Sequence, residues 1–125
     1  MASVLLVEDD ASVRMFVRRA LEHDGHVVSE SSDGAEALDT LRSGAGEAEL
    51  VLSDIQMPVM DGIELALNVA REWPEIPLLL MTGYAHQRER ANGLDALVRD
   101  VIEKPFTLAE VRARVNEALA DRERA

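Results

Sequence analysis

Residues 50–62 read Leu50-Val51-Leu52-Ser53-Asp54-Ile55-Gln56-Met57-Pro58-Val59-Met60-Asp61-Gly62, and this stretch decides the fold of the chain. Its apolar start has the length and composition of a buried strand, and the strand stops at a carboxylate, Asp54, before a loop that contains Pro58. A charged side chain in that place lies at the rim of a sheet, where a ligand can reach it. Two other strand ends supply Glu8-Asp9-Asp10 and Lys104-Pro105.

Strand-like and helix-like segments alternate on both sides of this stretch. Short apolar runs at 4–7, 27–28, 50–53, 77–81 and 98–102 predict five strands. Apolar residues at helical spacing predict helices between the strands, with Phe16, Leu67 and Leu108 among the side chains expected to face the core. Alternation of this kind predicts an α/β protein, a doubly wound five-stranded parallel sheet with helices on both faces.

The composition of the chain limits its functions. Its 125 residues are expected to form a single domain, 1–125, without a linker or an output domain. A formal charge of -11 argues against binding to nucleic acid or to an anionic membrane. The absence of cysteine excludes disulfides and thiolate metal sites. No apolar run has the length of a membrane span, and we expect a cytoplasmic protein.

The residues that follow the strands can form a metal and phosphate site. Ligands of doubly wound sheets bind beyond the carboxyl ends of the strands. If the first and third strands are neighbours, Glu8, Asp9 and Asp54 converge there, and like charges that close require a proton or a cation. Hard oxygen ligands with an open side suit Mg²⁺, with Mn²⁺ as an alternative. Asp10 is interpreted instead as a helix cap.

Cationic and hydroxyl groups complete the predicted site. Lys104 is the only lysine among 13 basic side chains, and Pro105, an X-Pro residue that can adopt the cis form, follows it. Thr82, followed by Gly83, can donate a hydrogen bond to a phosphoryl oxygen. A carboxylate, a metal and a lysine suit one reaction, in which Asp54 attacks a phosphoryl donor and becomes an acyl phosphate. Such a product acts as a switch because it carries new charge and new acceptor oxygens.

Four motifs, in this order and spacing, resemble the receiver domain of two-component response regulators over essentially the whole chain. They are Leu5-Leu6-Val7-Glu8-Asp9-Asp10, Asp54 to Leu65, Met81-Thr82-Gly83 and Lys104-Pro105-Phe106. The resemblance implies a flavodoxin-like sheet of order 2-1-3-4-5. It implies that Asp54 accepts a phosphoryl group from a sensor histidine kinase or a histidine phosphotransfer protein, and that Thr82 and Lys104 bind the phosphoryl oxygens. The implied metal ligands are Asp9, Asp54, the backbone carbonyl of Gln56, and Glu8 mainly through water.

One position departs from the common pattern of the family. Many receivers carry Tyr or Phe three residues before the lysine, where this chain has Val101. Tyr84, two residues after Thr82, resembles a subgroup with Thr-Gly-Tyr that is common among single-domain regulators. We hypothesise that Tyr84 reports occupancy of the site, with a simple cap of the pocket as the alternative. Gln56 and Tyr84 are expected to tune the lifetime of the phosphoryl group.

The expected output is a protein contact through the face formed by the fourth and fifth helices and the fifth strand. The polar segment from His86 to Gly93 predicts a loosely held fourth helix. The protein is expected to be a monomer or a phosphorylation-linked homodimer, and to be no enzyme beyond its own phosphorylation and dephosphorylation. The alternatives are a phosphate shuttle or sink in a phosphorelay, and a receiver-fold binding module that is not phosphorylated.

Two rival functions fit these residues less well. A haloacid-dehalogenase-type phosphatase needs an acid two residues after its nucleophile, and Gln56 cannot transfer a proton. A histidine phosphocarrier would use His23, His26 or His86, but all three are expected to be exposed in loops or at helix ends.

Overall fold

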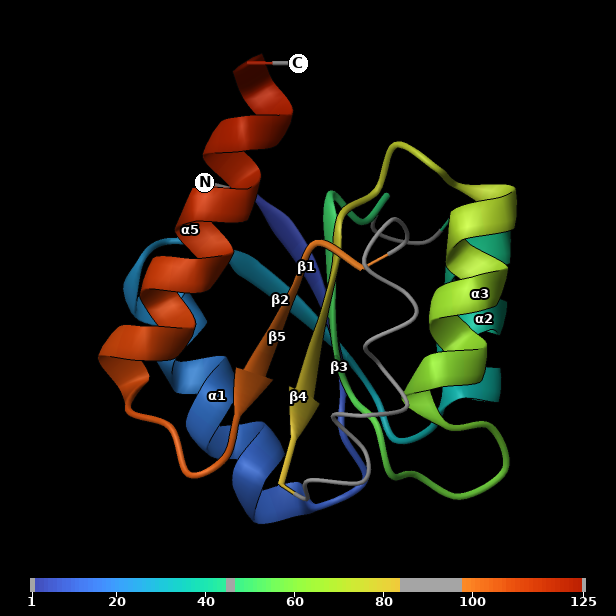
Figure 1. Cartoon of the computed structure of the whole chain (residues 1–125), viewed down its shortest axis with the longest axis horizontal. Helices are drawn as coiled ribbons and strands as arrows, with labels where there is room; N and C mark the ends of the chain where they lie inside the picture. Colours follow the sequence, from blue (N-terminus) through green and yellow to red (C-terminus); the bar gives the residue numbers. More distant parts are fainter. Residues whose placement is uncertain (1, 45–46, 84–97, 125) are drawn as a thin grey trace.

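The structure is a computed structural model that describes residues 2–44, 47–83 and 98–124. Its centre is a five-stranded parallel sheet in the order β2-β1-β3-β4-β5 (Figure 1). The strands are β1 (Ser3–Val7), β2 (Val27–Ser31), β3 (Leu50–Asp54), β4 (Leu78–Thr82) and β5 (Asp100–Glu103). The described helices are α1 (Ala11–His23), α2 (Gly34–Ser43), α3 (Gly62–Glu72) and α5 (Leu108–Arg124). The predicted fold class and strand order are confirmed.

Aspartates begin three of these helices. The side chain of Asp10 accepts hydrogen bonds from the backbone N–H groups of Ser12 and Val13, as expected for the cap of α1. Asp33 and Asp61 accept the same kind of bond at the starts of α2 and α3. Each cap fixes where the chain turns from a strand-end loop into a helix, so the loops at this edge of the sheet have defined conformations.

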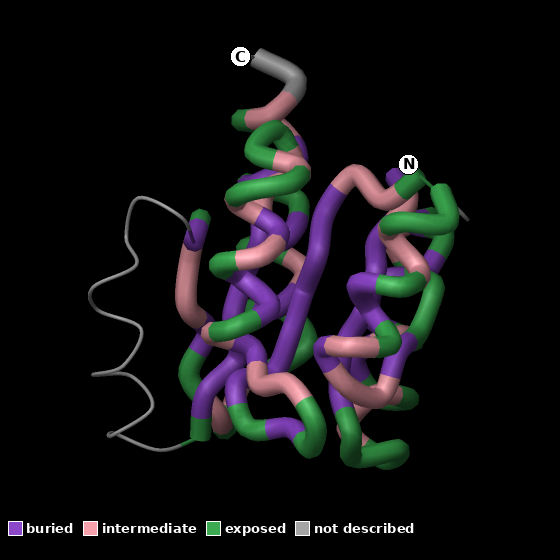
Figure 2. Tube along the Cα trace, turned by 90° about the vertical axis from the view of Figure 1, so that its right-hand side faces the viewer, coloured by how far each residue is buried: buried purple, intermediate pink, exposed green. Residues whose placement is uncertain are grey.

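The helices cover the sheet on both faces. α1 and α5 lie on one face, and α2 and α3 lie on the other (Figure 1). Alternate residues of β1 and β3 serve the two sides, so that Leu6 and Leu52 pack towards α1 and α5, while Leu5 and Val51 pack towards α2 and α3. Figure 2 shows the buried residues running through the centre of the molecule. A sheet buried on both faces leaves its carboxyl edge as the place for polar chemistry.

Three helix side chains predicted to face the core are exposed. Phe16 is 46% exposed, Leu67 is 47% exposed and Leu108 is 38% exposed. In α3 the buried face is formed by Leu65, Ala66 and Val69. Helical spacing identifies an apolar stripe, but it does not reveal which edge of the stripe reaches the sheet.

Two further expectations are corrected. The fifth strand was predicted from Val98, but its ladder begins at Asp100, although Val98 itself is buried. His26 is buried rather than exposed: its Nδ1 accepts a bond from the backbone N–H of Ala2 at 3.1 Å, and its Nε2 lies 2.8 Å from Oδ1 of Asn116 on α5. These partners make His26 a structural link, which removes it as a phosphocarrier.

Among the described residues, no helix combines the length and the apolar character needed to span a bilayer. Tyr84 and the segment from His86 to Gly93 lie outside the described residues, and so do the expectations attached to them.

Candidate functional site

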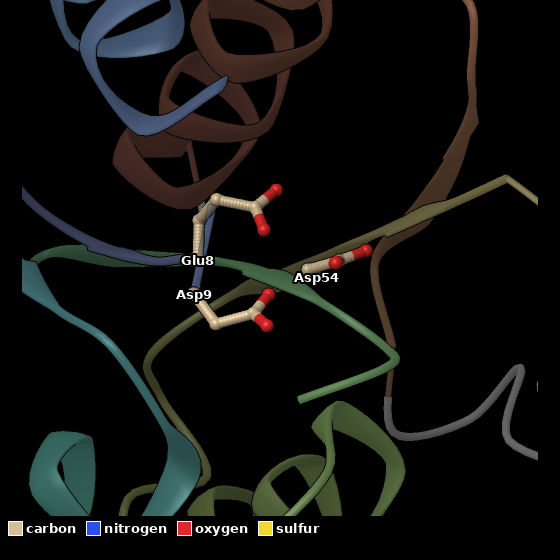
Figure 3. Close-up of side chains that lie close together, drawn as sticks. All are labelled: Glu8, Asp9 and Asp54. Carbon is tan, nitrogen blue, oxygen red and sulfur yellow. The ribbon is translucent and has the colours of Figure 1, made fainter. Parts of the chain in front are cut away.

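Three carboxylates converge at the carboxyl edge of the sheet. Val7 pairs with Ser53 in the parallel ladder, so Glu8 and Asp9, which follow β1, come beside Asp54 at the end of β3. Figure 3 shows Glu8 and Asp9 extending from one strand end towards the region of Asp54. One oxygen of each carboxylate lies within 4.8 Å of the others. The structure therefore brings together the three acids that the sequence assigned to one site.

The three acids differ in burial. Glu8 is 1% exposed and Asp54 is 7% exposed, whereas Asp9 is exposed to solvent. An ionised carboxylate is costly to bury without a partner. The site therefore has two acids that need a cation and one acid that reaches into solvent.

Lys104 is the cation that meets the buried pair. Its Nζ lies 3.2 Å from Oε1 of Glu8 and 3.3 Å from Oδ1 of Asp54. The Lys104–Pro105 peptide bond is cis, which Pro105 allows. Lys104 thus forms an ion pair with both buried acids, Glu8 and Asp54.

The electrostatics of the site follow from this burial. Burial, followed by the charge of Asp54, raises the pKa of the Glu8 carboxyl to about 7, although Lys104 opposes the shift. Burial likewise raises the pKa of Asp54 against the effect of Lys104. Burial by itself would lower the pKa of Lys104, but the carboxylates of Asp54 and Glu8 raise it. One ammonium is not enough for two buried acids and Asp9, so the site favours a further proton or cation.

Backbone contacts hold Asp54 in place. Oδ1 of Asp54 accepts a hydrogen bond from the backbone N–H of Ile55 at 3.0 Å. The backbone N–H of Gly62 donates a hydrogen bond to the carbonyl of Ile55 at 2.8 Å. A Cβ on Gly62 would lie 2.2 Å from the carbonyl oxygen of Asp54, a distance that no side chain tolerates. The first turn of α3 therefore rests directly on the backbone of Asp54. Sequence reasoning used Gly62 only as part of a motif, because a contact between two backbones leaves no periodic signal.

Three hydrogen bonds hold Glu8 in place. Its N–H donates to the carbonyl of Ser31 at the end of β2 at 3.0 Å. Its own carbonyl accepts a bond from Nη1 of Arg14 at 2.7 Å, and its Oε2 accepts one from the N–H of Asp10 at 3.2 Å. Arg14 was missed by sequence reasoning. Its position one turn into α1 was the available signal, because helical side chains tilt back towards the preceding loop.

An open cleft of about 530 Å³ surrounds these groups. Gln56 is exposed in its lining, whereas the Thr82 side chain is buried at the end of β4 and the next residue, Gly83, contributes to the wall. Val101 lies on β5, half-buried against the core under α2 and α3. The residues that line the cleft are Glu8, Asp9, Asp10, Val13, Asp54, Gln56, Gly83, Lys104 and Pro105.

A small apolar patch adjoins this cleft. It consists of Ala11, Met15 and Phe16 at the start of α1 and Leu108 at the start of α5, beside a hollow of about 490 Å³. Met15 is 54% exposed, and the side chains of Phe16 and Leu108 are also open to solvent. Two of the apolar helix residues that do not enter the core, Phe16 and Leu108, therefore lie in this patch.

The chain belongs to the response regulator receiver domain family, whose pattern it matches over residues 4–116. The response regulator MprA of Mycolicibacterium vanbaalenii is 38% identical over 116 residues, which are 93% of this chain and 49% of MprA. MprA of Mycobacterium avium is 40% identical over the same length and is covered to 50%. The chain thus spans about half the length of these curated relatives.

Solved structures agree with this assignment. A CheY-like receiver domain protein from Methanospirillum hungatei superimposes with a TM-score of 0.89 at 26% identity, with 99% of this chain and 98% of that chain covered. The response regulator TrrA of Thermotoga maritima, solved with Mg²⁺ and BeF, has a TM-score of 0.83 at 27% identity, with coverage of 94% and 98%. The chain is therefore a receiver domain of the two-component type in both sequence and fold.

Proposed function

We propose that this chain is a phosphorylation-dependent signalling switch in which Asp54 accepts a phosphoryl group from the phosphohistidine of a sensor histidine kinase or a histidine phosphotransfer protein. The observation that carries the proposal is the convergence of Glu8, Asp9 and Asp54 around the ammonium of Lys104. A carboxylate placed among acids and one cation, in an open cleft, is suited to receive a phosphoryl group rather than to stabilise the fold.

The transfer is a displacement at phosphorus. A carboxylate oxygen of Asp54 forms a bond to phosphorus while the bond between phosphorus and the imidazole nitrogen of the donor breaks. The electron pair of that bond stays on the imidazole, which takes a proton from solvent. The products are an acyl phosphate on Asp54 and a neutral histidine. Lys104 stays near the new phosphoryl oxygens, because its ammonium already reaches Oδ1 of Asp54.

The donor set fits a divalent metal. Three carboxylates within 4.8 Å of one another, two of them buried, form the hard oxygen environment that Mg²⁺ or Mn²⁺ prefers. Asp9, Asp54 and the carbonyl of Gln56 would hold the ion, with Glu8 acting mainly through water. When bound, the ion neutralises charge on the phosphoryl oxygens. Thr82 would add a hydrogen bond to a phosphoryl oxygen from the end of β4.

The apolar patch beside the cleft supports a protein as phosphodonor. A cluster of exposed apolar side chains next to a functional cleft is a common mark of a protein contact. We expect Phe16→Ala to slow transfer from a phosphorylated histidine phosphotransfer protein. The same variant should retain the wild-type rate with acetyl phosphate, because a small donor needs no docking surface.

The chain has no proposed catalytic activity beyond its own phosphorylation and dephosphorylation. The proposed output is a protein contact through β5, α5 and the segment for which the sequence predicts a fourth helix, which lies outside the described residues. The second candidate is transfer of the phosphoryl group from Asp54 to another carrier. The open cleft beside the exposed Asp9 would give such a carrier access to the site. If the output is a protein contact, the partner can be a second copy of this chain, and phosphorylation would then favour a homodimer.

Incubation with acetyl phosphate and Mg²⁺, followed by intact-mass measurement, tests the proposal. The wild type should gain one phosphoryl group that hydroxylamine removes, as it does from an acyl phosphate. Asp54→Asn should gain none. Asp10→Asn is the matched control, since it alters another cleft aspartate but keeps a helix-capping side chain. Modification of Asp54→Asn at the wild-type rate, or an unmodified wild type, would exclude Asp54 as acceptor.

A further inference from the structure

A second groove lies at the opposite edge of the sheet from the acid cleft. It has a volume of about 420 Å³ and is bounded by the segment before β3, the turn between α3 and β4, and the C-terminal ends of α2 and α5. In Figure 1 the strand arrows point away from this edge, where α3 and α5 also end. The proposed phosphorylation chemistry uses none of its residues.

The floor of this groove is apolar. Leu41, Ala48, Trp73 and Ile76 line it, and all four are partly buried side chains that pack on the core under α2 and α3. Part of each side chain therefore remains open to a ligand. Trp73 is the only tryptophan of the chain. An aromatic ring in a half-open groove can bind an aliphatic group on its surface or a cation over its face.

The rim of the groove is negatively charged. Glu47 and Glu75 line it and are exposed, and within the described part of the chain neither side chain has a hydrogen bond or an ion pair. The remaining charges of the lining pair with each other, because Nη1 of Arg122 lies 3.5 Å from Oε2 of Glu49. Two carboxylates thus remain without a cation beside the apolar floor.

The helix ends add to this potential. α2 ends at Ser43 and α3 ends at Glu72, so the carbonyl ends of both helices lie at the groove. The C-terminus of a helix carries a partial negative charge that favours a nearby cation. Apolar floor, unpaired acids and helix ends are complementary to one kind of group, a positively charged head on an aliphatic stem.

We propose that this groove is a docking site for a basic segment of a partner protein, with an arginine or lysine stem lying on Trp73 and its charge between Glu47 and Glu75. The groove and the cleft lie at opposite edges of the sheet, so this contact uses none of the groups that would hold the phosphoryl group. It gives the domain a second protein contact. Exposed ion pairs and an exposed cation–aromatic contact are individually weak, so the binding is transient.

Fluorescence of Trp73 tests this proposal directly, since no other tryptophan contributes. The probe is the peptide acetyl-Leu-Arg-Leu-Arg-Leu-amide, titrated into the full chain. We expect a saturable change in emission that weakens as salt is raised. The double variant Glu47→Gln/Glu75→Gln should bind the peptide about five-fold more weakly, the loss expected from removing two exposed charge contacts.

A charge-matched variant separates this site from general attraction to an acidic protein. Glu22→Gln/Glu64→Gln removes the same charge from exposed positions on α1 and α3 that do not line the groove. It should keep the wild-type affinity. Three outcomes would overturn the proposal: no saturable change in Trp73 emission, equal affinity for acetyl-Leu-Gln-Leu-Gln-Leu-amide, or an equal loss of affinity in the charge-matched variant.

Discussion

The buried Glu8 carboxyl should make the stability of the metal-free protein fall as the pH rises. Its pKa is 4.5 in an unfolded chain and about 7 in the folded protein, mainly because of burial and secondly because of Asp54. Between those two values the folded state keeps a proton that the unfolded state has released. The stabilisation is therefore complete below pH 4.5 and is lost as the pH rises through about 7.

The size of this effect follows from the pKa difference. Each pKa unit corresponds to about 1.4 kcal/mol, so the free energy of unfolding should fall by about 3 kcal/mol across this window. Glu8→Gln cannot ionise and should lack this component. Asp54→Asn should reduce it, because the charge of Asp54 contributes to the raised pKa of Glu8. Added Mg²⁺ should restore stability at the upper end, where the acids are ionised.

Urea unfolding at a series of pH values in the presence of EDTA measures this effect. The quantity to compare is the difference in unfolding free energy between Glu8→Gln and the wild type, which cancels the contribution of acids that do not interact with Glu8. Glu64→Gln, a change at an exposed glutamate, is the control and should follow the wild type. A difference between Glu8→Gln and wild type that stays constant within about 1 kcal/mol across the window would refute the reasoning.

Three further predictions test close packing, an ion pair and the core. Gly62→Ala should destabilise the protein by about 3 kcal/mol in urea unfolding and lower its rate of phosphorylation, because the new Cβ would collide with the carbonyl of Asp54. Gly83→Ala should cost under about 1 kcal/mol, because its Cβ would meet only Cδ and Cβ of Lys104, at 3.8 and 3.9 Å. Asp24→Asn should lower the free energy of unfolding by about 1–2 kcal/mol at neutral pH, because the Arg112 guanidinium and Asn116 lower the pKa of Asp24 to about 2. The difference in unfolding free energy between variant and wild type should shrink as the pH falls from 3.8 towards 2. Leu52→Ala should cost about 3 kcal/mol by thermal or urea unfolding, whereas Leu67→Ala on the exposed side of α3 should cost under about 1 kcal/mol, and equal losses would contradict the assignment of the core.

The residues at strand ends could be predicted because a parallel sheet has a simple rule. Every strand delivers its last residue to the same edge, so Glu8, Asp9, Asp54 and Lys104 were placed together without knowledge of side-chain contacts. The extent of β5 could not be read in the same way. Val98 is buried before the ladder begins, and an apolar residue signals burial rather than pairing.

The misplaced residues share a different cause. Phe16 and Leu108 continue the apolar stripes of their helices, yet they lie on the surface beside the cleft. Helical periodicity identifies apolar side chains on one face of a helix. It does not show whether the core or another protein covers them. Arg14 was missed for the opposite reason, because a guanidinium bound to a backbone carbonyl looks like an ordinary exposed arginine in the sequence.

The seat of Gly62 against Asp54 has a mechanical consequence. Where side chains separate a helix from a strand, they can change rotamer and so accommodate small displacements of one element without moving the other. At this junction no side chains intervene, because backbone touches backbone. A shift of Asp54 by a fraction of an ångström must therefore push the first turn of α3, and the rest of that helix follows as a stiff rod. We therefore expect β3 and α3 to move together.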